Sequence, residues 1–208
     1  MERILEERKI NWLLHFTQAT NLPSIFQYGI LPKSELLKND IPADTNDDYR
    51  YDDCEDAICT SIEFPNYKMF WGLRQDDPDV DWAVLLLNSQ ILLDFECAFC
   101  TTNAGSAMSF NIPLKKRMGE KAFLKLFDEI PHKPSRRELG LRNCYPTDPQ
   151  AEVLVFGRIP IDYIATVYFE KTDALNAYSR YIPQKISAEV NRKPFGYRYD
   201  WEHWKGSI

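Results

Sequence analysis

The sequence lacks the glycine-rich motifs with which the commonest nucleotide-binding folds hold phosphate. Neither GxGxxG nor GxxxxGK occurs in its 208 residues, which argues against Rossmann and P-loop binding. A long apolar run is also missing, because the longest, at 82–87, falls well short of the roughly 18 residues that span a bilayer. Internal repeats and low-complexity tracts are absent too. We therefore expect a single globular domain over residues 1–208 and no membrane segment.

An excess of positive charge is missing as well. The formal net charge is −6, which argues against non-specific coating of nucleic acid but leaves room for a local basic groove. The cysteines number five, an odd count, and the N-terminus runs into charged residues instead of an apolar signal core. These features favour a reducing, cytoplasmic location.

Cys97 and Cys100 have the spacing of a zinc or redox pair. A structural zinc site normally needs four ligands, and the chain offers no second such pair and only 3 histidines. We therefore expect no metal, and we interpret the pair as two semi-buried thiols on a short strand, with a metal site as the alternative.

Hydrophobic patterning predicts a mixed α+β fold. Strands are expected at 12–17, 57–62, 82–87, 97–100, 152–156 and 163–169, and helices near 22–28, 34–38, 67–71, 118–130 and 172–180. Two long polar loops, at 30–56 and 131–149, separate these elements. Loops of this length in a compact domain are usually functional or disordered.

Glu152 places a carboxylate at the start of an otherwise apolar strand. Gln150 and Glu152 should project from the same side, because side chains alternate along a strand. Such a carboxylate suits a site where positive charge develops on a bound substrate, although a solvated glutamate is the ordinary alternative. His15 and Thr17 likewise share one face of the first strand, where His15 could equally be a core histidine.

The segment 192–201 interleaves basic residues with aromatic rings. Such a tail could stack on unpaired bases while its cations contact phosphates. Alternatively, it packs down on the domain as a closing flap.

Several segments together resemble the DarT family of DNA ADP-ribosyltransferase toxins. They are LHFT at 14–17, NLPSI at 21–25, GIL at 29–31, PNYKMF at 65–70 and QAEVLV at 150–155. Their order and spacing match the family over about residues 10–170. The resemblance implies an ADP-ribosyltransferase fold: two packed, mostly antiparallel sheets that form a cleft for bent NAD, with flanking short helices.

The resemblance also implies a reaction. NAD is the co-substrate, nicotinamide leaves, and ADP-ribose is transferred to a base in single-stranded DNA without a metal. A macrodomain antitoxin of the DarG type is the implied partner. The segments 66–70 and 100–104 lead us to favour guanine slightly over thymine. An RNA or protein acceptor and a catalytically dead nucleic-acid-binding module are the alternatives.

Site residues follow from the same resemblance. Glu152 matches the catalytic glutamate, and Arg50 is the best candidate for a catalytic arginine, with Arg74 second. The candidates for NAD contacts are His15, Thr17, Asn21, Tyr67 and Met69, and those for substrate contacts are Gln150, Arg136 and Arg137. Breaking an N-glycosidic bond builds positive charge on the ribose, so a fixed carboxylate stabilises the transition state more than the ground state.

Overall fold

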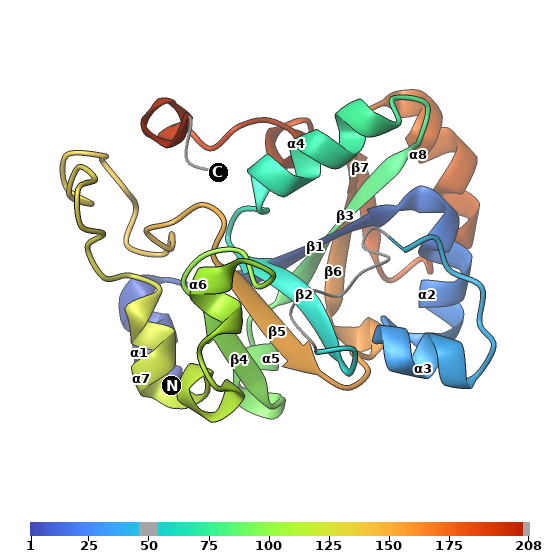
Figure 1. Ribbon diagram of the computed structural model, residues 1–208. Coiled ribbons are helices and arrows are strands. Elements are labelled where there is room, and N and C mark those ends of the chain that lie inside the picture. Colours follow the sequence, from blue (N-terminus) through green and yellow to red (C-terminus); the bar gives the residue numbers. More distant parts are fainter. Residues whose placement is uncertain (46–53, 206–208) are drawn as a thin grey trace.

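The structure, a computed structural model, describes residues 1–45 and 54–205. In this part of the chain the strands form one seven-stranded sheet with the order β4-β5-β2-β1-β3-β6-β7 (Figure 1). The strands are β1 (Trp12–Gln18), β2 (Ala57–Ile62), β3 (Trp82–Asn88), β4 (Cys97–Cys100), β5 (Glu152–Phe156), β6 (Ile164–Phe169) and β7 (Ser187–Val190).

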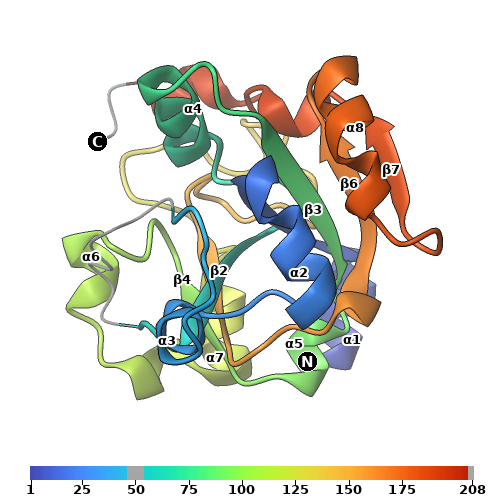
Figure 2. The ribbon, with the colours of Figure 1, turned by 90° about the vertical axis from the view of Figure 1, so that its right-hand side faces the viewer.

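Short helices flank this sheet, as expected. They are α1 (Glu2–Arg8), α2 (Leu22–Tyr28), α3 (Lys33–Lys38), α4 (Tyr67–Asp76), α5 (Ile91–Asp94), α6 (Ala107–Phe110), α7 (Gly119–Lys125) and α8 (Thr172–Tyr178). Figure 2 shows α2 in front of the sheet near β3, α8 in front of β6 and beside β7, and α4 at the upper left. No helix in the described ranges has the length and apolarity to cross a membrane.

The mixed α+β, mostly antiparallel character is confirmed. Every named strand pair is antiparallel except β6 and β7. Parallel neighbours need a crossover connection, and α8 lies on the chain between β6 and β7. The sequence did not predict β7, because Ser187–Val190 is a short edge strand with little apolar content.

The two expected sheets are joined into one sheet that opens in its middle. β1 pairs with β3 along its whole length, but with β2 only through Leu13↔Ile62 and Leu14↔Ser61. Beyond these two pairs β1 and β2 part, so the backbone groups of alternate residues on that edge of β1 face a gap. The gap lies between the half of the sheet with β2, β4 and β5 and the half with β1, β3, β6 and β7.

Alternation along β1 sends its side chains into two cores. Leu13 belongs to the main core, whereas Leu14 and Phe16 pack on the opposite face. There the Phe16 ring stacks on Phe70 of α4 at 4.5 Å between centroids, and Phe195 of the C-terminal segment packs against Phe70. β1 is therefore fixed from both sides, and α4 is anchored beside its end.

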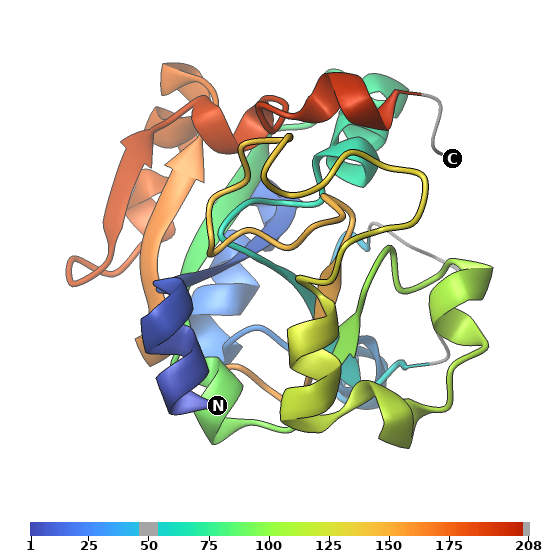
Figure 3. The ribbon, with the colours of Figure 1, turned by 90° about the vertical axis from the view of Figure 1, so that its left-hand side faces the viewer.

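Helix α7 ends at Lys125, sooner than the expected 118–130. From Leu126 onward the backbone bonds tighten to the i→i+3 kind, as in the bond from the Leu126 N–H to the Phe123 carbonyl. The Leu126 carbonyl then accepts the Thr147 N–H at 2.8 Å. A tertiary contact therefore ends the helix and ties down the loop 131–149 beneath the C-terminal segment (Figure 3).

Cys97 and Cys100 do not form a common site. Both are buried on β4, and they belong to two different hydrophobic clusters. Residues three apart on a strand point to opposite faces, so the two thiols cannot chelate one ion. Burial raises the pKa of Cys97 to about 12, which keeps that thiol protonated at neutral pH.

Gly29, the C-cap of α2, provides a stability test of the backbone where this helix ends. Its φ is +85°, and an added Cβ would lie 2.6 Å from the Ile159 carbonyl oxygen. We expect Gly29→Ala to lower the free energy of unfolding by about 1–3 kcal/mol, measured by urea denaturation. Gly72→Ala is the matched control, because open space surrounds Gly72 and alanine favours a helix over glycine by about 0.5–1 kcal/mol. Equal stability of Gly29→Ala and the wild type would contradict this account.

Candidate active site

A cavity of about 510 Å³ lies where β1 and β2 part. This volume is within the range of small-molecule and cofactor sites. Its walls come from β1, α2, the following segment, β2, α4, the loop after β4 and the first residue of β5. The lining residues with polar side chains include His15, Thr17, Asn21, Ser24, Lys33, Asp44, Thr60, Asn103 and Glu152.

The Glu152 carboxylate is buried in the wall of this cavity. The residue is 5% exposed and begins β5. Its Oε1 accepts hydrogen bonds from Asn66 Nδ2 at 2.9 Å and from Asn103 Nδ2 at 3.5 Å, and its Oε2 accepts one from the Ala104 N–H at 2.8 Å. A buried carboxylate is tolerated only with such donors, which fix its position and stabilise its negative charge.

Asn66 orients this carboxylate and is a site residue that the sequence pattern did not predict. It is completely buried, and its Oδ1 accepts the Met69 N–H at 3.3 Å, which caps α4. Because the oxygen faces the helix, the NH₂ group must face Glu152. The signal in the sequence is an asparagine after Pro65 at the start of a predicted helix, a capping position.

His15 bridges the two strands where they separate. Its Nδ1 lies 2.8 Å from the Cys59 carbonyl oxygen on β2. A carbonyl only accepts, so Nδ1 carries the proton in the neutral ring and Nε2 is left as an acceptor. Burial lowers the pKa of His15. The half-buried ring lines the cavity, and so does Thr17 on the same face, as predicted.

Asn21 lines the cavity, but its side chain holds the protein together there. Its Nδ2 donates to Thr17 Oγ1 at 3.0 Å and to the Asp44 carbonyl at 2.9 Å, and its Oδ1 accepts the Asp44 N–H at 2.9 Å. It occupies the N-cap position of α2 without capping the helix through its side chain. Asn21 therefore positions the segment around Asp44 at the cavity wall.

Of the two remaining candidates for NAD contacts, Met69 and Tyr67, only Met69 lies in the cavity wall. Tyr67 does not, because its ring packs against Phe64 and meets Tyr197 edge-on, which corrects its expected place.

Arg50, the first candidate for the catalytic arginine, lies outside the described residues. Arg74, the second candidate for the arginine, is turned away from the cavity to Glu170 and the Phe195 carbonyl.

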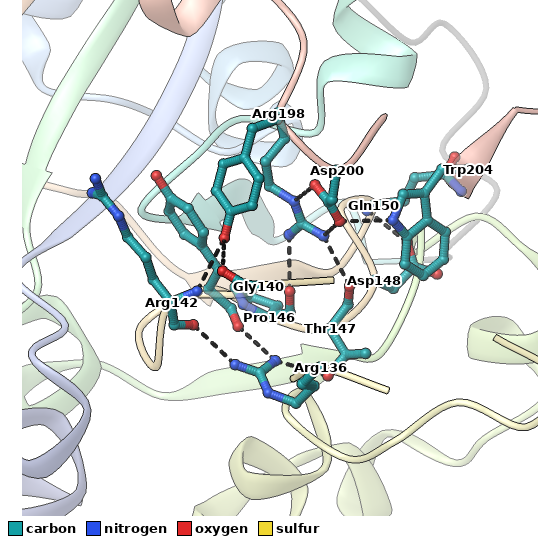
Figure 4. Close-up of polar contacts among 12 residues, drawn as sticks. Arg136, Gly140, Arg142, Pro146, Thr147, Asp148, Gln150, Arg198, Asp200 and Trp204 are labelled. Carbon is teal, nitrogen blue, oxygen red and sulfur yellow. Dashed lines mark hydrogen bonds and ion pairs between the residues drawn. The ribbon is translucent and has the colours of Figure 1, made fainter. Parts of the chain in front are cut away.

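The candidates for substrate contacts lie outside the cavity lining, on or next to the loop 131–149. Arg136 donates to the carbonyls of Tyr145 and Arg142 and to Thr147 Oγ1, so its guanidinium is engaged in holding the loop (Figure 4). Arg137 is exposed, and Gln150 is half-buried. The expected phosphate contact therefore fits Arg137 better than Arg136.

Within the described ranges, no group of three or more His, Cys, Asp or Glu side chains is placed to hold a metal ion.

A protein-family model described as DarT, ssDNA thymidine ADP-ribosyltransferase, matches residues 14–201. No curated protein matches the chain.

Solved structures share the fold. Thermosipho africanus DarTG in complex with ADP-ribose has a TM-score of 0.59 and 17% identity, over 88% of this chain and 50% of that one, so this chain spans half its length. Thermus sp. 2.9 DarT in complex with NAD+ has a TM-score of 0.57 and 11% identity, over 89% of this chain and 97% of that one. The same Thermus protein in complex with ADP-ribosylated ssDNA has a TM-score of 0.58 and 11% identity, over 90% and 97%.

The contact between Asn66 and Glu152 can be measured with a double-mutant cycle. Asn66→Ala removes both the helix cap and the donor, so the cycle with Glu152→Ala isolates the pair. Urea denaturation of the wild type, the two single variants and the double variant gives the coupling free energy. We expect about 1.5–3 kcal/mol, the range for a hydrogen bond to a charged group. Additive losses would show that the carboxylate does not depend on Asn66.

His15 predicts a pH dependence of stability. The folded-state pKa lies below the ordinary value of 6.5, so the unfolded chain takes up its proton first as the pH falls. The free energy of unfolding should therefore decrease from about pH 6.5 down to the folded-state pKa. NMR titration of the imidazole gives that pKa, and His15→Gln should flatten this part of the stability profile. An imidazole that titrates at or above 6.5 would contradict the account.

Proposed function

Because the chain belongs to the DarT family of ssDNA thymidine ADP-ribosyltransferases, we propose that it transfers ADP-ribose from NAD to a base in single-stranded DNA and releases nicotinamide. The observation that carries this proposal is the fixed carboxylate of Glu152 in the cavity wall between β1 and β2. A dinucleotide bound in this cavity would bring its nicotinamide-side ribose to that carboxylate.

Departure of nicotinamide leaves oxocarbenium character on the ribose. A carboxylate that is already held by Asn66 and the Ala104 N–H needs no reorganisation as this charge develops, so it stabilises the transition state more than the ground state. We assign this catalytic role to Glu152.

NAD itself would be held by the open edge of β1 and by the side chains around it. His15, Thr17 and Met69 line the cavity and are the contacts we assign to the nicotinamide side. The diphosphate needs cations or N–H donors. Arg50 remains our candidate for this contact or for catalysis, and Lys33 in the cavity wall is a further cation.

The acceptor base is guanine or thymine. The sequence favours guanine slightly, and the description of the matched family names thymidine. The exposed Arg137 and the half-buried Gln150, on and next to the loop that leads to β5, are our candidates for contacts with the incoming strand. The second candidate function is transfer of ADP-ribose to RNA or protein. Mass spectrometry of DNA, RNA and protein after reaction with NAD identifies the acceptor directly.

We also propose a biological setting. Modification of DNA bases would make the protein a cytoplasmic toxin, and a DarG-like macrodomain antitoxin would remove the modification. The similarity to a DarTG structure that contains ADP-ribose supports this partner.

The assay for the proposed function is transfer of label from NAD to single-stranded oligonucleotides. Glu152→Ala should reduce the rate by at least about 100-fold, the loss typical of one preorganised electrostatic contact. Glu63→Gln is the control, because Glu63 is also hydrogen-bonded, to the Asn11 and Trp12 N–H groups, but lies outside the cavity lining. No transfer by the folded wild-type protein to any strand, or an equal loss in both variants, would reject the proposal.

A further inference from the structure

The C-terminal segment 195–205 alternates buried and exposed side chains. Arg198 and Asp200 are buried, at 2% and 3% exposure, whereas Tyr197 and Tyr199 are 48% and 51% exposed. The segment crosses the loop 131–149 next to α4 (Figure 3). It thus packs down on the domain, as the flap alternative predicted, and still presents aromatic rings to solvent.

A buried ion pair fixes this segment in place. Arg198 binds both carboxylate oxygens of Asp200, at 2.6 and 2.7 Å, and donates to the carbonyls of Pro146 and Thr147 at 2.8 and 2.9 Å. Asp200 also accepts the Trp204 indole N–H at 2.7 Å (Figure 4). The neighbouring exposed rings are therefore held on a rigid support, which reduces the entropy lost when they bind a ligand.

The exposed Tyr197 ring stacks on the half-buried ring of Trp201. The Tyr197 ring lies on Trp201, with 5.1 Å between centroids and an interplanar angle of 24°, and Lys205 Nζ lies 4.0 Å from the Trp201 centroid. We call Tyr197, Trp201 and Lys205 the tail platform. Glu202, 3.6 Å from Lys205, is an acidic side chain beside it, and Asp148 lies near Lys68. Lys133 adds a second cation, 4.9 Å from the Trp204 ring.

The first turn of α4 connects the tail platform to the cavity. Asn66, its cap, binds Glu152, and Tyr67 packs edge-on to Tyr197 at 5.7 Å between centroids. Lys68 Nζ donates to the Trp204 carbonyl at 3.1 Å, while Met69 lines the cavity. The start of α4 therefore touches both the Glu152 carboxylate and the exposed Tyr197 ring.

We propose that the tail platform binds nucleotides next to the acceptor base, with a base stacked on the Tyr197–Trp201 pair and the lysines near the phosphates. This inference rests on the proposed function, and it assigns a subsite for the single strand outside the cavity. Flat rings with adjacent cations suit unpaired bases and their backbone. A local cluster of Lys68, Lys133 and Lys205 on a chain of net charge −6 favours a polyanion over an apolar partner.

The test compares the binding of a long single strand with reaction on a mononucleotide, which has no neighbouring base to stack on the platform. Tyr197→Ala and Trp201→Ala should each weaken the binding of the long strand about 10-fold, as expected for the loss of one stacked base, measured by fluorescence anisotropy. The KM for the long strand should rise while kcat stays unchanged, and reaction with the mononucleotide should not change.

Two controls separate stacking from folding. Tyr197→Phe keeps the ring and should behave as the wild type, as should Tyr181→Ala, which removes a tyrosine of 37% exposure beside α8. If Trp201→Ala lowers the melting temperature, the more exposed Tyr197→Ala carries the stacking test. Lys205→Ala should reduce the slope of the logarithm of the binding constant against the logarithm of the salt concentration by about 1.

The outcomes distinguish the two proposals. If the wild type modifies DNA but Tyr197→Ala binds long strands as tightly as the wild type, the tail platform is wrong and the proposed function stands. A loss that is equal for the mononucleotide and the long strand would also overturn the platform, because it would indicate a general structural effect. If the wild type modifies no strand, both proposals fail.

Discussion

The burial of one carboxylate is the constraint on which the rest of the site depends. Glu152 is 5% exposed at the start of β5, and a charged group in such a place requires donors that are already fixed. Asn66 and the Ala104 N–H, 86 and 48 residues away in sequence, supply them. Two loops must therefore close on β5 before the carboxylate can be accommodated. The side-chain amide of Asn66 also caps α4, so the position of that helix is coupled to the position of the carboxylate.

The second requirement is the opening between β1 and β2. A continuous ladder would fill this space with strand pairing, but only Leu13 and Leu14 of β1 pair with β2. Where the ladder ends, the His15 side chain connects the two strands through its bond to the Cys59 carbonyl. Asn21 fixes the cavity wall around Asp44. Several polar residues in the cavity wall thus bind other parts of the protein, and the edge of β1 remains to meet a ligand.

Sequence patterns predicted the strands Ala57–Ile62 and Glu152–Phe156 correctly, because each is a short apolar run bounded by turn residues. They could not predict which long-range partner a side chain would find. Tyr67 packs in a hydrophobic cluster, and Arg136 donates to loop carbonyls. Helix α7 ends just before Leu126, whose carbonyl accepts the Thr147 N–H. Asn66 was recognisable as a cap, but its bond to Glu152 spans 86 residues and has no local signal.

A crystal structure of the protein with a non-hydrolysable NAD analogue tests the central claim most directly. The account predicts the dinucleotide in the cavity between β1 and β2, with a Glu152 carboxylate oxygen within about 2.6–3.2 Å of the 2-hydroxyl of the nicotinamide-side ribose. Asn66 and the Ala104 N–H should keep their bonds to Glu152 in that complex. A dinucleotide bound elsewhere, or one whose nicotinamide-side ribose lies out of reach of Glu152, would contradict it.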